Sequence, residues 1–198
     1  MGTLCAISLK KPCSVNKLRQ LNIDSTWSLF LDRDGVINKK LDNDYVKNID
    51  EFEFVEGAQV SIQKMTKLFG RLFLVTNQQG IGKGIMTHED LKVVHDYMEE
   101  GLKPFDVKFD ALYYCPDLAA ENTLCRKPNI GMALQAKKDF PEVDFLKSII
   151  VGDSITDIQM GKRARMKTVF IHEDVANPEE ADFVVKSLDE FSILLENS

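Results

Sequence analysis

The chain has 198 residues, with 25 lysines and arginines against 31 aspartates and glutamates, and a formal net charge of −6. This length predicts one folded domain with a sizeable core, and a hydrophobic content of 44% is typical of a globular protein. The acidic balance argues against a nucleic-acid-binding protein. Because no apolar run approaches the roughly 18 residues of a membrane span, we expect a cytoplasmic protein.

Two further features concern the organisation of the chain. The cysteines show no tight, repeated spacing, which argues against a framework of disulfide bonds. They are Cys5, Cys13, Cys115 and Cys125. Residues 1–26 show no clear pattern, and we interpret them as an N-terminal extension lying against the core. The folded domain is therefore expected to comprise 27–198.

Short apolar segments alternate with segments of helical periodicity along the chain. The predicted strands are Ser28–Leu31, Arg71–Val75, Ala111–Tyr114, Ser148–Val151 and Thr168–Ile171. The predicted helices are Gly57–Phe69, His88–Leu102, Gly131–Phe140 and Ile155–Ala164, the second opened by a capping box from Thr87 to Asp90. Several strands are apolar at consecutive residues, as in a parallel sheet buried on both faces. The alternation predicts an α/β fold with a doubly wound, mainly parallel, Rossmann-like sheet.

Polar side chains follow four of the predicted strands, at the carboxyl ends where ligands bind in such sheets. The four segments are Asp32-Arg-Asp34-Gly35, Thr76-Asn77-Gln78-Gln79-Gly80, Cys125-Arg126-Lys127-Pro128 and Gly152-Asp153-Ser154-Ile-Thr-Asp157. Their coincidence predicts a functional site at one edge of the sheet. His88, His95 and His172 lie outside these segments, and we interpret them as helix-surface or loop residues.

The aspartates in these segments favour a magnesium site. Carboxylates from Asp32, Asp34 and Asp153 would supply the hard oxygen ligands that Mg²⁺ prefers, with waters and a substrate phosphate completing its coordination. Asp157 fits two roles, since Ser154-Ile-Thr-Asp157 is also a capping-box pattern.

Lys127 and Thr76 provide the opposite polarity at the same edge. The lysine would neutralise phosphate oxygens as a point charge, and the threonine hydroxyl would donate a hydrogen bond to them. Together with the aspartates, these groups suit attack by a carboxylate on phosphorus, with the metal and the lysine offsetting charge.

The order DxDG, T-N, K-P and GDxxxD resembles the haloacid dehalogenase (HAD) superfamily of phosphotransferases. The resemblance implies that Asp32 is the nucleophile and that Asp34 is the general acid and base, which also offers its main-chain carbonyl to Mg²⁺. It further implies that Thr76 and Lys127 hold the phosphoryl group and that Asp153 binds the metal. The segments between these motifs are filled by the expected helices, strands and loops, which places the chain in the branch without a cap domain.

Longer stretches resemble the D-glycero-D-manno-heptose-1,7-bisphosphate 7-phosphatase family. They include Leu31–Asn38, Asp44–Gly57, Thr76–Gly84 and Cys125–Pro128. The resemblance implies a small phosphorylated sugar as substrate, with Asn77 and Arg126 in contact with it. Histidinol-phosphate phosphatase is the alternative enzyme, and a catalytically silent HAD-like binding module is the alternative of a different class. The oligomeric state is not predicted.

One loop departs from the pattern of these families. They usually carry a Cys-x-His…Cys-x-Cys zinc loop, whereas this chain has Cys115-Pro-Asp117 and Thr123-Leu-Cys125. Since structural zinc sites need four closed nitrogen or sulfur ligands, zinc is not expected. A disulfide between Cys115 and Cys125 would need oxidising conditions, which the cytoplasm disfavours.

Overall fold

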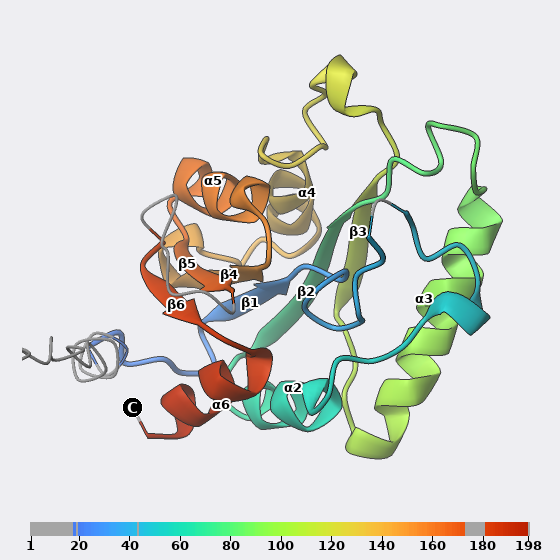
Figure 1. Cartoon of the computed structure of the whole chain (residues 1–198). Coiled ribbons are helices and arrows are strands. Elements are labelled where there is room, and N and C mark those ends of the chain that lie inside the picture. The colour runs from blue at the N-terminus through green and yellow to red at the C-terminus, as the bar shows by residue number, and fades with distance from the viewer. Residues whose placement is uncertain (1–17, 19, 43, 173–180, 198) are drawn as a thin grey trace, which may run out of the picture.

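The computed structural model describes residues 18, 20–42, 44–172 and 181–197. Its centre is a sheet of six strands in the order β3-β2-β1-β4-β5-β6 (Figure 1). The strands are β1 (Ser28–Leu31), β2 (Arg71–Asn77), β3 (Ala111–Cys115), β4 (Ser148–Gly152), β5 (Lys167–Ile171) and β6 (Phe183–Val185). All five neighbouring pairs run parallel, which confirms the predicted α/β architecture.

Helices cover both faces of this sheet. They are α2 (Ala58–Thr66), α3 (His88–Leu102), α4 (Gly131–Asp139), α5 (Ile155–Ala164) and α6 (Leu188–Glu196). Short 3-10 helices lie at η1 (Ile49–Glu51), η2 (Lys103–Phe105), η3 (Ala119–Glu121) and η4 (Phe145–Lys147). The capping box at Thr87 is present as predicted, with Asp90 as its second member. Strand β6 and helix α6 extend the pattern beyond the elements that the sequence predicts.

Alternate residues of each central strand point to opposite faces, which explains the continuous apolar segments. In β1, Leu29 and Leu31 join the core cluster that α2, α3 and α6 cover, whereas Phe30 joins the cluster beneath α4 and α5. Every residue of β1 and β4 is buried. The central strands are therefore buried, and the polar side chains of the site follow at their carboxyl ends.

The predicted extension falls largely outside the described residues, because nothing is described for 1–17 and 19. Leu18 is 1% exposed and belongs to the core cluster, and Trp27 is 6% exposed. The boundary at 26–27 stays a prediction.

The segment between Asp34 and Thr76 adds no cap domain to the described fold. It contains a flap, defined here as 38–54 with position 43 undescribed, followed by α2 and β2. Asn38 anchors the flap through β-bridges to Asp34 and Phe54. Among the described helices, none combines the length and the apolar composition that crossing a bilayer requires.

Candidate active site

Lys127 lies at the centre of the polar edge. Its side chain is 1% exposed, and its ammonium nitrogen lies 2.9 Å from Asp32 Oδ1 and 2.6 Å from Asp157 Oδ1. The same nitrogen donates a hydrogen bond to the main-chain oxygen of Val75. Burial by itself would lower the pKa of Lys127, but the carboxylates of Asp157 and Asp32 outweigh burial and raise it. The lysine is therefore a fixed positive charge beside Asp32.

Asp32 directly follows β1 and is held by the sheet. Its main-chain nitrogen donates to the carbonyl of Val151 in β4, 3.0 Å away. Its side chain accepts a hydrogen bond from the main-chain nitrogen of Arg33 at 2.7 Å. Burial raises the pKa of Asp32 to about 7, and the negative charge of Asp157 adds to the rise. A further cation beside Asp32 would favour its ionised, nucleophilic form.

Asp157 has the capping role that the sequence left open, and it also forms an ion pair in the site. Its Oδ2 accepts hydrogen bonds from the main-chain nitrogen and the hydroxyl of Ser154, completing the capping box of α5. Its Oδ1 forms the ion pair with Lys127. A side chain at Gly152 would collide with this carboxylate, so the glycine allows the helix start to approach the strand end. Asp157 therefore places a buried negative charge in the site while it caps α5.

Three carboxylates converge beside the lysine. Asp32, Asp153 and Asp157 each offer an oxygen, and these oxygens all lie within 4.8 Å of one another. Asp153 Oδ1 is buried and has no hydrogen-bond partner among the described residues. Gly35 lies against Asp153 with φ +82°, where any Cβ would collide with the carboxylate. Oxygens of this kind suit Mg²⁺, and Asp32 and Asp153 are predicted metal residues, whereas Asp157 is already paired with Lys127 and Ser154.

Asp34 lies outside that group and is held separately. Its carboxylate accepts hydrogen bonds from Arg33, Asn38 and Gln78, each with a shortest distance of 2.9 Å. Burial opposes the charged form of Asp34, but Arg33 and the hydrogen bonds outweigh it and lower its pKa. The carboxylate of Asp34 is therefore held in its ionised form, outside the group of oxygens that could hold a metal.

Gln78 is a site residue that the sequence analysis missed. Its amide nitrogen donates to Asp34 Oδ2 and to Thr76 Oγ1, both at 2.9 Å, and the residue is fully buried. Because the Thr76 oxygen accepts this bond, its hydroxyl proton is free to point to another acceptor. The T-N-Q sequence could have indicated this residue, but only the fold shows which groups it joins.

Asn77 and Arg126 were expected to contact substrate. In the structure, Asn77 holds the main chain of Lys127, with its side-chain oxygen accepting from Lys127 N at 3.0 Å and its amide donating to Lys127 O at 3.1 Å, and its contact with substrate stays a prediction. Asn77 therefore positions the lysine by fixing its backbone. Arg126 is partly exposed and donates from Nη1 to the main-chain oxygen of Asp117. Thr76 and Asn77 are the last two residues of β2, which ends two residues later than the predicted strand.

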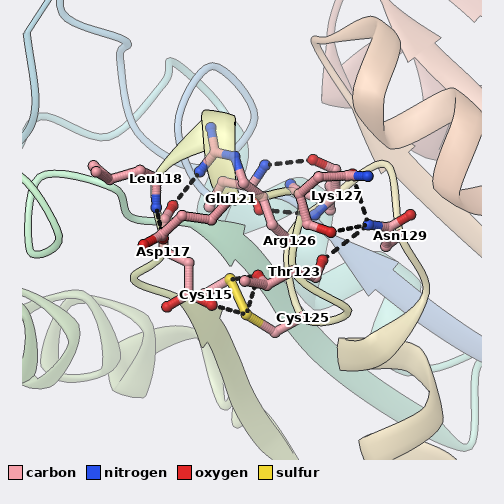
Figure 2. Close-up of a disulfide and its surroundings, with 11 residues drawn as sticks. Cys115, Asp117, Leu118, Glu121, Thr123, Cys125, Arg126, Lys127 and Asn129 are labelled. Carbon is pink, nitrogen blue, oxygen red and sulfur yellow. Dashed lines mark hydrogen bonds between the residues drawn. A yellow bond between two sulfur atoms is a disulfide. The ribbon is translucent and has the colours of Figure 1, made fainter.

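The loop 115–126 corrects one expectation. Cys115 and Cys125 form a disulfide, with their Cα atoms 5.4 Å apart (Figure 2). Asp117 Oδ2 lies 3.2 Å and Thr123 Oγ1 lies 3.4 Å from Cys125 Sγ. The four positions that the family resemblance matches to zinc ligands thus lie close together in this structure. Their different side chains meet there as a covalent crosslink, a carboxylate and a hydroxyl.

The histidines also differ from the sequence interpretation in one case. His95 is 5% exposed and packs edge-on against Tyr114. Burial, followed by the nearby charge of Arg33, lowers the pKa of His95 to about 3. It is therefore a neutral core residue rather than a helix-surface one.

Comparisons with known proteins agree with this geometry. The family model described as HAD-hydrolase-like matches residues 124–191. A D-glycero-alpha-D-manno-heptose-1,7-bisphosphate 7-phosphatase from Campylobacter jejuni is 39% identical over 158 residues, which are 80% of this chain and 88% of the relative. A D-glycero-beta-D-manno-heptose-1,7-bisphosphate 7-phosphatase from Escherichia coli K12 is 36% identical over 151 residues, 73% and 78% of the two chains.

A solved structure gives the same result. The D,D-heptose 1,7-bisphosphate phosphatase from B. bronchiseptica, complexed with magnesium and phosphate, matches with a TM-score of 0.77 and 27% identity over 87% of this chain and 99% of that one. The parallel sheet, the aspartates at its edge and these matches define a phosphatase of the HAD superfamily. Within that class, the chain belongs to the heptose-1,7-bisphosphate 7-phosphatase family.

Proposed function

We propose that this phosphatase hydrolyses the 7-phosphate of a D-glycero-D-manno-heptose 1,7-bisphosphate, with Mg²⁺ as cofactor and a phosphorylated Asp32 as intermediate. The observation that carries the proposal is the buried ammonium of Lys127 between Asp32 and Asp157, beside three converging carboxylate oxygens. Such an arrangement concentrates fixed positive charge and cation ligands around one buried nucleophile. The relatives supply the substrate class, since they are named for heptose bisphosphate.

The first chemical step is attack by an Asp32 carboxylate oxygen on phosphorus. The new bond is an acyl phosphate, and the bond that breaks joins phosphorus to the sugar oxygen. Lys127 stabilises the charge on the transferred group, and the Thr76 hydroxyl donates to one of its oxygens. When bound at Asp32, Asp153 and the Asp34 carbonyl, Mg²⁺ would supply further positive charge to the same oxygens.

Asp34 carries the protons in both steps. The hydrogen bonds from Arg33, Asn38 and Gln78 favour its ionised form, but the negative charge of an arriving phosphate ester raises its proton affinity. Protonated Asp34 then gives its proton to the departing sugar alkoxide. In the second step it takes a proton from the water that attacks the acyl phosphate, which releases orthophosphate and restores Asp32.

A comparison of substrates tests this proposal. Orthophosphate release is measured with Mg²⁺ for the α and β anomers of the heptose bisphosphate and for histidinol phosphate. We expect one of the heptose anomers to have the highest kcat/KM and turnover to stop when EDTA removes the metal. A higher kcat/KM for histidinol phosphate would overturn the substrate assignment. An absence of turnover on all three would favour the silent binding module.

A further inference from the structure

Two neighbouring lysines of the flap have different partners. Lys39 pairs with Glu53, which lies in the same flap. Lys40 reaches across 113 residues of sequence, and its ammonium nitrogen lies 2.7 Å from Asp153 Oδ2. Lys39 thus forms an ion pair within the flap, whereas Lys40 connects the flap to a carboxylate of the proposed metal site.

The charges of the site show why Lys40 matters. Three cations, Arg33, Lys127 and Lys40, form ion pairs with the aspartates of the site at positions 32, 34, 153 and 157. Arg33 pairs with Asp34, and Lys127 pairs with Asp32 and Asp157. Asp153 therefore depends on Lys40 for its counter-charge. Without a metal, Lys40 provides the positive charge that Asp153 would otherwise receive from one.

The three cations differ in their freedom to move. The side chains of Arg33 and Lys127 are 0% and 1% exposed, so separating either from its partner would leave buried charges uncompensated. The side chain of Lys40 is 53% exposed, and Asp153 is 16% exposed. Lys40 can leave its partner and be hydrated at once, which makes it the exchangeable cation of the three.

We infer that Lys40 is an exchangeable counter-ion that occupies Asp153 until a divalent cation displaces it, and that the freed ammonium then binds a phosphate of the substrate. The inference rests on the metal dependence in the proposed function. It predicts an order of binding, because Lys40 offers its charge to an anion only after it has left Asp153. The flap lysine is thereby a binding residue for phosphate and a competitor of the metal.

The first experiment measures cation binding without substrate. Metal-free wild type, Lys40→Gln and Lys39→Gln are titrated with Mn²⁺, which accepts the same oxygen ligands as Mg²⁺, and free Mn²⁺ is followed by electron paramagnetic resonance. Because Lys40 competes with the cation, Lys40→Gln is expected to bind Mn²⁺ about two- to fivefold more tightly, the range of a partly exposed ion pair. Lys39→Gln should match wild type. Equal affinities in Lys40→Gln and wild type would overturn the inference.

The second experiment measures phosphate binding with the metal site saturated. Orthophosphate affinity is determined by calorimetry in excess Mg²⁺ for the same proteins and for Lys40→Arg. We expect Lys40→Gln to bind orthophosphate several-fold more weakly, and Lys40→Arg and Lys39→Gln to bind it as wild type does. An unchanged affinity in Lys40→Gln would overturn the phosphate role. Neither experiment requires turnover, so the results stand apart from the identity of the sugar substrate.

Discussion

Three buried groups at the centre of the site depend on one another. Lys127 contacts Asp32 and Asp157 at once, and Asn77 fixes its main chain with two hydrogen bonds. Removal of one carboxylate leaves the lysine with the other, but removal of the lysine leaves two buried aspartates without a counter-charge. Substitutions within this set will therefore differ in their effect on folding as well as on activity.

Asp32→Asn should abolish phosphate release and leave the protein folded. A neutral amide is a poor nucleophile and a poor magnesium ligand, while Lys127 keeps its ion pair with Asp157. The assay is orthophosphate release on the best substrate, and circular dichroism monitors the fold. Near-normal turnover in this variant would contradict the nucleophile assignment.

Lys127→Ala should lose activity and stability together. It leaves Asp32 and Asp157 buried without their cation, a change that typically costs about 3–5 kcal/mol. Urea unfolding would compare the free energy of unfolding of Lys127→Ala with that of Asp32→Asn, which should be far closer to the wild-type value. Equal unfolding free energies for Lys127→Ala and wild type would contradict the central place of the ion pairs.

Gln78→Leu should lower kcat more than it raises KM. The substitution removes the donor that joins Asp34 to Thr76, so Asp34 loses one of the three residues that donate hydrogen bonds to its carboxylate. Since general acid–base groups contribute about 10²–10⁴-fold, we expect a loss smaller than that of Asp34→Asn. The pH profile of kcat should also move to higher pH, because Asp34 loses a donor that favours its ionised form and its pKa therefore rises. An unchanged profile would assign Gln78 a purely structural role.

At the scale of elements, two loops border the strand ends. The flap is linked to the site by Lys40 and by the hydrogen bond from Asn38 to Asp34. The loop 115–126 is closed by the Cys115–Cys125 disulfide, contains Arg126 and directly precedes Lys127. Since the domain has no cap in its described part, these loops are the elements available to select the substrate.

The loop 115–126 should hold its shape without zinc. A disulfide leaves no thiolate for the metal. After reduction, Cys115, Asp117 and Cys125 would offer three ligand atoms within 4.8 Å of one another, one fewer than the four of a structural zinc site. Metal analysis of the purified protein should find well under one zinc per chain. Activity should survive a zinc-selective chelator when Mg²⁺ is replenished. Stoichiometric zinc bound through Cys115 and Cys125 would overturn this prediction but leave the aspartate chemistry intact.

At the scale of the whole molecule, the buried imidazole of His95 makes stability depend on pH. The folded-state pKa of about 3 lies below the ordinary value of about 6.5, so between these values the unfolded chain binds the extra proton. Stability is therefore lost as the pH falls below about 6.5. Because Nε2 has no hydrogen-bond partner among the described residues, the folded state offers this proton no compensating acceptor.

His95→Leu should flatten this dependence. The wild type is expected to lose about 2 kcal/mol more than the variant between pH 7.5 and pH 5. Urea unfolding at both values measures the difference, and the titration of every other group cancels in the comparison. Parallel losses in the two proteins would show that the pKa of His95 is the same in the folded and unfolded states, which would contradict the lowered pKa.

The sequence by itself determined the elements and the positions of the polar groups. Continuous apolar segments such as Ser28–Leu31 predict buried parallel strands, and periodicity predicts the helices, because both signals depend on neighbours within a few residues. The motifs that follow the predicted strands place Asp32, Asp34 and Lys127 at one edge of the sheet. These motifs too are recognised from residues that are close in the sequence. Boundaries shifted slightly, as when β2 proved to include Thr76 and Asn77.

Only the tertiary structure decided which of these groups meet. The ion pair of Lys40 with Asp153 and the two hydrogen bonds between Asn77 and Lys127 join residues that are 113 and 50 positions apart, and the disulfide closes a loop. Spacing cannot show such pairs, because their distances depend on how strands and loops pack. The burial of His95 also depends on tertiary packing, because the sequence does not show which elements lie against its turn of the helix. Local patterns in the sequence therefore predict the elements and the polar groups at their ends. Packing determines which of these groups contact one another and how their pKa values shift.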